Sequence, residues 1–250
     1  MTATLLIMTV GLFILSVASG MVGLGVAFAA VPFLGFFLPD LVHQVQPLSL
    51  LLNGVTALFA ATGFARSKLI DWKPALALTI VASIAAPAGS WLAQYTGQTW
   101  IWGLYLAAVV FLAARMFTKD KPRDPDAAPN LRLALLLAVP IAIIAGMLGV
   151  GPGFLLMPAL ILVGYHPKVA AGITAVAVTL PSFTALVPHL GTAQIDITQA
   201  AFLVVAGALG SFFLGARLTS KFVSGPILKR IFGILIVVMT AVKVITLLTS

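Results

Sequence analysis

Two glycine clusters are the part of this sequence best suited to chemistry, because few of its side chains could act as acids, bases or nucleophiles. Five glycines and one proline make up the clusters: Gly23, Gly25, Gly149, Gly151, Gly153 and Pro152. Glycine permits tight turns and close backbone approach, and proline suits the first position of a helix. A helix that starts at such a turn has free N–H groups and a positive dipole end, which together attract an anion. The clusters therefore predict two helix ends that bind one anion through the backbone.

The two clusters are copies of one motif. Residues 20–32 align with residues 146–158 at a constant shift of 126, with six of thirteen positions identical. A second match pairs Asp71 with Asp196 at a shift of 125, and both residues have the position of an N-cap before an apolar segment. We therefore predict two homologous halves, an N-terminal repeat over 1–118 and a C-terminal repeat over 131–250. A hydrophilic linker over 119–130 joins them.

The composition predicts an all-α integral membrane protein. Apolar residues make up 61% of the 250 residues and charged residues only 8%, and the mean hydropathy is +1.17. A soluble domain carries about 25% charged residues, and a transmembrane barrel would show short alternating segments instead of long apolar runs. The net charge of +8 is explained better by basic cytoplasmic loops than by nucleic-acid binding. The chain has no cysteine, so disulfides and thiol chemistry are excluded.

Each half is predicted to contain a broken or re-entrant helix pair followed by three transmembrane helices. The two segments around each glycine cluster are too short to cross about 30 Å of hydrocarbon, and the later segments are long enough. The predicted segments are 4–19, 26–38, 45–64, 74–93 and 100–117 in the first half, and 132–146, 152–164, 168–188, 197–216 and 226–248 in the second.

Charge distribution favours inverted halves. If each broken pair returns to its starting side, 13 of the 14 basic residues lie in the cytoplasm, and only Lys243 does not. If each pair counts as one crossing, nine basic residues lie in the cytoplasm and five lie outside. The positive-inside rule prefers the inverted arrangement, with a cytoplasmic linker and both termini outside. Inverted repeats with broken helices are typical of secondary transporters, whose sites lie near mid-membrane where the repeats meet.

Polar residues within the spans are the remaining candidates for a binding site. Asn53 is the single asparagine inside an apolar stretch, and Thr174 belongs to a group of hydroxyls in the matching spans with Ser49, Thr56, Thr179, Ser182 and Thr184. Such side chains either mark a substrate pathway or form hydrogen bonds between helices. The glycines likewise have an alternative role in close helix packing. His43, His166 and His189 lack metal-ligand spacing and are expected at the membrane surface, so neither a metal nor another cofactor is predicted.

The repeated Gly-x-x-Gly-x-Gly followed by an apolar run and Pro32 or Pro158 resembles the TauE/SafE family of sulfite exporters over essentially the whole chain. The second copy is closest to the family signature, whereas Val26 and Ala27 replace further glycines in the first. The resemblance implies export of sulfite or small organosulfonates across a bacterial cytoplasmic membrane, with both glycine segments in the transport path.

Three alternatives stay open at this point. The chain could be a permease for another small solute, including an importer. An intramembrane hydrolase would need a nucleophile and a base, for which Ser182 and His189, seven residues apart, are the available pair. A non-transporting anchoring protein would tolerate a larger residue at Gly151. No span carries an Asp or Glu at its centre, so transport would be electrogenic or coupled through a histidine or the substrate's own proton.

Overall fold

A computed structural model describes residues 3–117 and 128–215, together with residues 234, 237, 238, 241, 242 and 245. These residues form helices and loops and contain no strand. Most of the predicted linker and of the last predicted span, including Lys243, lies outside the described residues. The prediction of an all-α membrane protein is confirmed, since five helices are long and apolar enough to cross a bilayer.

The helices follow the predicted order in both halves. The first half contains α1 Ala3–Val22, α2 Ala27–Leu34, a π-helical turn η1 Leu41–Val45, α3 Gln46–Arg66, α4 Trp72–Gln94 and α5 Gln98–Phe117. The second half contains α6 Leu131–Leu148, α7 Gly153–Leu162, α8 Pro167–Leu186, a 3-10 turn η2 Val187–His189, α9 Ile197–Leu209 and a π-helical turn η3 Gly210–Gly215.

Both interrupted segments fold back as hairpins. Gly11 of α1 lies against the ring of Phe33 of α2. In the second half, the backbone N–H of Asn130, just before α6, donates to the carbonyl oxygen of Val163, just after α7, at 2.9 Å. The end of α7 therefore returns to the side on which α6 begins.

The sequence predicted that the first segment of each broken pair is too short to cross the bilayer, and this prediction is wrong. Helix α1 has 20 residues and α6 has 18, or about 30 and 27 Å at 1.5 Å per residue. Both helices continue through a glycine that packs closely against a neighbouring element. A Cβ on Gly20 would lie 2.9 Å from the Ser211 hydroxyl oxygen, and one on Gly146 would collide with the Ala86 carbonyl oxygen. These two glycines serve helix packing, so the chain breaks only after them.

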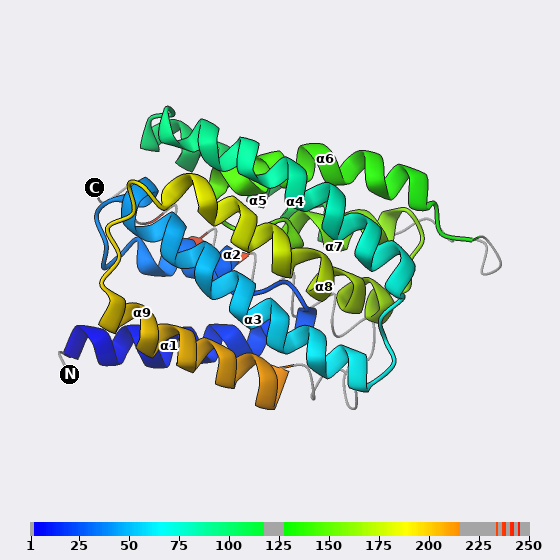
Figure 1. Ribbon diagram of the computed structural model, residues 1–250, viewed down its shortest axis with the longest axis horizontal. Helices are drawn as coiled ribbons and strands as arrows, with labels where there is room; N and C mark the ends of the chain where they lie inside the picture. Colours follow the sequence, from blue (N-terminus) through cyan, green and yellow to red (C-terminus); the bar gives the residue numbers. More distant parts are fainter. Residues whose placement is uncertain are drawn as a thin grey trace.

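Helices α3 and α8 form the centre of the bundle, with α4 and α6 on one side and α1 and α9 on the other (Figure 1). The two central helices run antiparallel, because Asn53 bonds to Ser182 while Gly172 packs against the carbonyl of Leu69. Elements of each half thus pack on the broken pair of the other half, α4 on α6 and α9 on α1. Inverted halves require this antiparallel course. The relation between the complete halves stays a prediction, because the last span lies largely outside the described residues.

The predicted N-caps are confirmed in position. The carboxylate of Asp196 accepts a hydrogen bond from the Gln199 backbone N–H at 3.0 Å before α9. Asp71 occupies the same position before α4, but its side chain makes no capping hydrogen bond.

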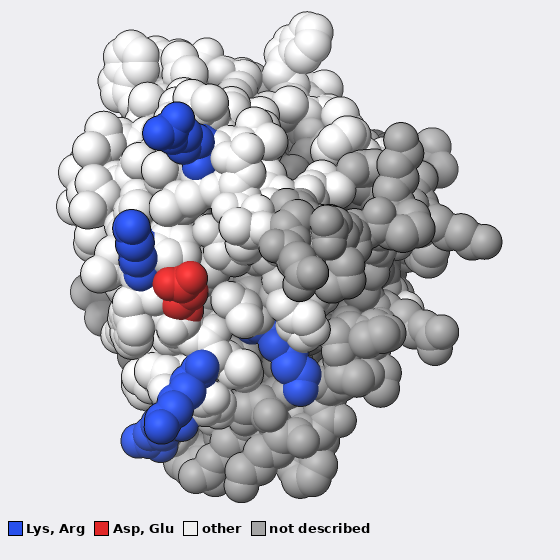
Figure 2. Space-filling view, turned by 90° about the vertical axis from the view of Figure 1, so that its right-hand side faces the viewer, with Lys and Arg blue, Asp and Glu red and all other residues white. Residues whose placement is uncertain are grey.

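The described basic side chains gather at one end of the bundle, the end at which α3 finishes and α4, α6 and α8 begin. Figure 2 shows this face, with Lys and Arg side chains on several sides of an acidic one. The residues are Arg66, Lys68, Lys73, Arg132 and Lys168. The opposite end carries Asp40, Asp196 and two histidines, and no Lys or Arg with a described side chain.

Candidate functional site

The two glycine breaks lie side by side in the middle of the bundle. Backbone φ angles are 71° at Gly23, 72° at Gly25, 68° at Gly149 and 67° at Gly151, all in the left-handed region that favours glycine. The predicted breaks at these residues are therefore confirmed. A Cβ on Gly153 would lie 2.6 Å from the Leu24 carbonyl oxygen, which shows how closely the two breaks approach.

Equivalent phenylalanines show that the first turns of α2 and α7 also meet. Phe28 and Phe154 occupy the same position of the repeated motif, and their rings stack with centroids 4.9 Å apart and planes inclined by 14°. A residue contacts its own equivalent where a twofold axis passes between two copies. Both helix ends therefore flank one central place, as the sequence predicted.

Asn53 connects both breaks. Its side chain is fully buried, and its carbonyl oxygen accepts a hydrogen bond from the Ala27 backbone N–H at 2.9 Å. Its amide nitrogen donates to the Ser182 hydroxyl oxygen at 2.9 Å. A Cβ on Gly25 would collide with the amide oxygen, and one on Gly151 would collide with the amide nitrogen. Asn53 lies midway along the Leu41–Arg66 helical span, which is long and apolar enough to cross a bilayer.

Two further contacts hold the outer glycine of each break. The Gly23 backbone packs against the carbonyl of Ala171, and the Gly149 backbone packs against the side chain of Gln46. The amide nitrogen of Gln46 also donates to the Met147 carbonyl oxygen at 3.0 Å. Sequence reasoning missed Gln46, although its spacing of seven residues from Asn53 places both amides on one face of α3.

Thr174 and Ser49 are buried at equivalent positions of α8 and α3. Each has a hydroxyl with no hydrogen-bond partner among the described residues. Thr174 follows Ala171 by one turn and precedes Val178, which touches Gly153, by another. Its predicted place beside the breaks is thus consistent with the packing of α8. The hydroxyls of Thr179 and Thr184 instead donate to carbonyls of their own helix.

Pro152 differs from its prediction by one position. The sequence places it as the first residue of a helix, whereas α7 begins at Gly153 and Pro152 precedes it, with φ −73°. Its missing N–H still costs nothing there, since the first N–H groups of a helix have no partner within the helix.

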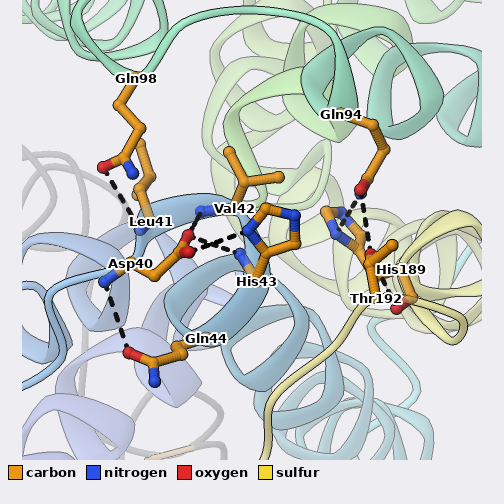
Figure 3. Close-up of polar contacts among 9 residues, drawn as sticks. All are labelled: Asp40, Leu41, Val42, His43, Gln44, Gln94, Gln98, His189 and Thr192. Atoms are coloured by element: carbon orange, nitrogen blue, oxygen red, sulfur yellow. Dashed lines mark hydrogen bonds and ion pairs between the residues drawn. The ribbon is translucent and has the colours of Figure 1, made fainter.

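A second polar cluster lies at the end of the bundle opposite the basic side chains (Figure 3). His43 Nδ1 is 2.9 Å from an Asp40 carboxylate oxygen, and His189 Nδ1 is 2.7 Å from the Gln94 amide nitrogen. The Thr192 hydroxyl donates to the Gln94 carbonyl oxygen at 3.0 Å. His189 lies at the end of the Pro167–His189 span, and its side chain is fully buried within the protein. It does not contact Ser182 by any hydrogen bond, so these two residues are not arranged as base and nucleophile.

Replacing Asp40 with alanine is expected to lower the free energy of unfolding by about 1 kcal/mol. The carboxylate accepts hydrogen bonds from the backbone N–H groups of Val42 and His43 at 3.0 and 2.9 Å. Burial alone would raise the pKa of Asp40, but hydrogen bonds from His43 and Val42 outweigh it and lower the pKa below the ordinary 3.8.

The stability that Asp40 contributes is therefore complete above pH 3.8 and is lost as the pH falls through its lowered pKa in the folded protein. Unfolding in detergent at neutral and acidic pH measures the difference. Asp71→Ala is the matched control, because Asp71 has an N-cap position without a side-chain hydrogen bond. An equal loss in both variants would contradict the capping role.

Comparisons with known proteins agree with this architecture. A protein with 28% identity, from Xylella fastidiosa, matches over 98% of this chain and 97% of its own length and is named a probable membrane transporter protein. Two more probable membrane transporter proteins are similar. One, from Methanocaldococcus jannaschii, is 25% identical over 71% of this chain and 69% of its own. The other, YunE of Bacillus subtilis, is 24% identical over 80% and 83%. No solved structure matches the chain. The family model described as sulfite exporter TauE/SafE matches residues 7–242, so the chain belongs to the TauE/SafE family of membrane transporters.

Proposed function

We propose that this protein is a secondary transporter that exports a small sulfur-containing anion, sulfite or an organosulfonate, across the bacterial cytoplasmic membrane. The observation that carries the proposal is the meeting of two left-handed glycine breaks at the centre of the bundle, where α2 and α7 begin. The family description supports sulfite as the substrate. The substrate site consists of the two breaks with Asn53 and Thr174.

The chemistry of this site suits an oxyanion. Backbone N–H groups and hydroxyls are hydrogen-bond donors, and the dipoles of both helices favour negative charge at their first turns. The breaks have no carboxylate beside them in the described residues, so an anion entering them meets no repulsion of that kind. With a negative cell interior, outward movement of one negative charge is favourable by about 2.3 kcal/mol per 100 mV.

The basic end of the bundle is the cytoplasmic end in this proposal, and both termini lie outside. The positive-inside rule supports this orientation, and the basic residues would also concentrate anions at the cytoplasmic entrance.

The orientation predicts opposite labelling of two cysteine variants in intact cells. The chain has no native cysteine, so each variant presents a single thiol. Lys73→Cys lies at the basic end, and Gly191→Cys lies in an exposed loop with nothing near it at the other end. A membrane-impermeant maleimide should modify Gly191→Cys at once and Lys73→Cys only after permeabilisation. The reverse pattern would overturn the orientation.

Substrate and direction are tested in liposomes loaded with sulfite, methanesulfonate, sulfate or acetate at a clamped membrane potential. We expect efflux of sulfite or methanesulfonate that increases as the interior becomes more negative. Flux that ignores both voltage and pH would exclude electrogenic export and export coupled to protons. Transport of acetate or a neutral solute alone would favour the alternative, a permease for another small solute, and inward transport driven by an ion gradient would favour an importer.

A further inference from the structure

The beginnings of α2 and α7 are equivalent in the repeat but differ in their hydrogen bonding. We propose that the transported oxyanion binds at the start of α7 alone, because side chains of α3 already occupy the equivalent place at the start of α2. This inference rests on the proposed function and makes it more specific.

The start of α2 is capped by α3. The Val26 backbone N–H donates to the Thr56 hydroxyl oxygen at 3.1 Å, and the Ala27 N–H donates to the Asn53 amide oxygen at 2.9 Å. The N–H groups of Val26 and Ala27 therefore already have buried acceptors, and an anion there would have to displace them.

The start of α7 has no such cap. At the shift of 125 that relates α3 to α8, Val178 takes the place of Asn53 and Pro181 takes the place of Thr56. Neither side chain can accept a hydrogen bond. Val178 occupies the equivalent place in space as well, since its Cγ2 is 2.8 Å from where a Cβ on Gly153 would lie. In the described part of the chain, the backbone N–H groups of Gly153 and Phe154 have no hydrogen-bond partner, whereas at the start of α2 only the equivalent of Phe154, Phe28, has none.

Buried hydroxyls without partners provide a second and independent observation. Ser49 lies on α3 between Gln46 and Asn53, whose side chains touch Gly149 and Gly151, so its hydroxyl faces the break that leads into α7. Thr174 precedes Val178 by one turn of α8. Both side chains are fully buried, and a hydroxyl in that state is expected to have a partner. A bound oxyanion would accept hydrogen bonds from them.

The orientation of the Asn53 amide matches this division. Its oxygen, an acceptor, faces the N–H groups of α2, and its nitrogen, a donor, faces Gly151 and Ser182. An anion at the start of α7 would thus meet donors from the α7 backbone, from Asn53 and from the two hydroxyls. The class of ligand that fits several donors around one centre is a small oxyanion with two or three oxygens, such as sulfite or a sulfonate group.

The test is to give α7 the cap that α2 has. Val178→Asn should place an amide oxygen on the free N–H groups of α7 and compete with the substrate. We expect binding of sulfite or methanesulfonate, measured as the anion-induced rise of the unfolding temperature in detergent, to weaken by about tenfold or more. The unfolding temperature without anion should stay unchanged or rise. Val178→Leu introduces a side chain with the same branching as asparagine but without a hydrogen-bonding group. This variant should bind the anion much more tightly than Val178→Asn.

A second pair of variants covers the case in which Val178→Asn fails to fold. Ser49→Ala removes a hydroxyl without a protein partner and should weaken anion binding by about fivefold or more without lowering the unfolding temperature. Thr184→Val removes a hydroxyl that bonds to its own helix and should leave binding unchanged.

The outcomes separate the two proposals. If no anion in the panel raises the unfolding temperature of the unaltered protein, and none is transported by it into or out of liposomes, the proposed function fails. Suppose that an anion binds the unaltered protein. The single site at α7 is wrong if Val178→Asn binds that anion as tightly as the unaltered protein does. It is also wrong if Val178→Leu weakens binding as much as Val178→Asn does. If Val178→Asn does not fold, the single site at α7 is wrong when Ser49→Ala binds the anion as tightly as the unaltered protein does.

Discussion

Replacement of Gly151 by valine is expected to abolish transport. The backbone at Gly151 has φ 67°, which costs other residues about 1–2 kcal/mol and costs β-branched residues more. A Cβ there would also collide with the Asn53 amide nitrogen and lie 3.0 Å from the Ser182 hydroxyl oxygen. Neither neighbour can retreat, because each is held by buried hydrogen bonds. The break would have to change shape, and with it the start of α7.

The measurement is anion flux in liposomes together with the unfolding temperature of the purified protein. We expect a loss of flux of about a hundredfold or more, since a cost of about 3 kcal/mol corresponds to that factor. Gly103→Val is the matched control: Gly103 lies in α5, is exposed, and has no atom within 4 Å of the added Cβ. Full transport by Gly151→Val would show that the breaks do not form the transport site.

Replacement of Asn53 by leucine is expected to lower the free energy of unfolding by about 2–4 kcal/mol and to stop transport. Leucine has the same branching and the same number of side-chain heavy atoms, but it cannot accept a hydrogen bond from the Ala27 N–H, which would be left buried without a partner. It also removes the donor that faces Gly151 and separates Ser182 from α3. The loss is large because Asn53 and Ser182 are fully buried, so no water can replace the lost bonds.

Denaturant unfolding in mild detergent measures this difference. Thr62→Leu, in the same helix, is the control, because the Thr62 hydroxyl bonds to its own helix through the Phe59 carbonyl. Its expected change is within about 0.5 kcal/mol. If Asn53→Leu were no less stable than Thr62→Leu, the bridge between the halves would have no energetic role.

Several features of the fold could be predicted because they depend on local properties of the chain. The composition determines that the solvent is lipid, and the length of each apolar run determines which helices can span it. The breaks at Gly23 and Gly151 were predictable because a left-handed turn strongly favours glycine. Gly20 and Gly146 belong to the same repeated motif but remain helical. The reason is packing against η3 and α4, which no local pattern shows.

The partners of the candidate residues depended on the tertiary structure. Asn53 and Ser182 are 129 residues apart, and their hydrogen bond exists only because α3 and α8 cross in opposite directions at the centre of the bundle. The same packing buries His189 beside Gln94 and places Gln46 against Gly149, so neither place could be predicted from spacing along the chain.

By itself, the sequence determined the solvent of this protein, its repeated glycine motif and the positions where its helices break. Those properties follow from hydropathy, from internal repetition and from the freedom of glycine, all of which act over a few residues. The tertiary structure alone decided that Asn53 and Thr56 cap α2 while Val178 leaves α7 uncapped. The physical reason is that a hydrogen bond between residues far apart in the sequence depends on the distance and direction of two groups. Only the packed bundle sets that geometry.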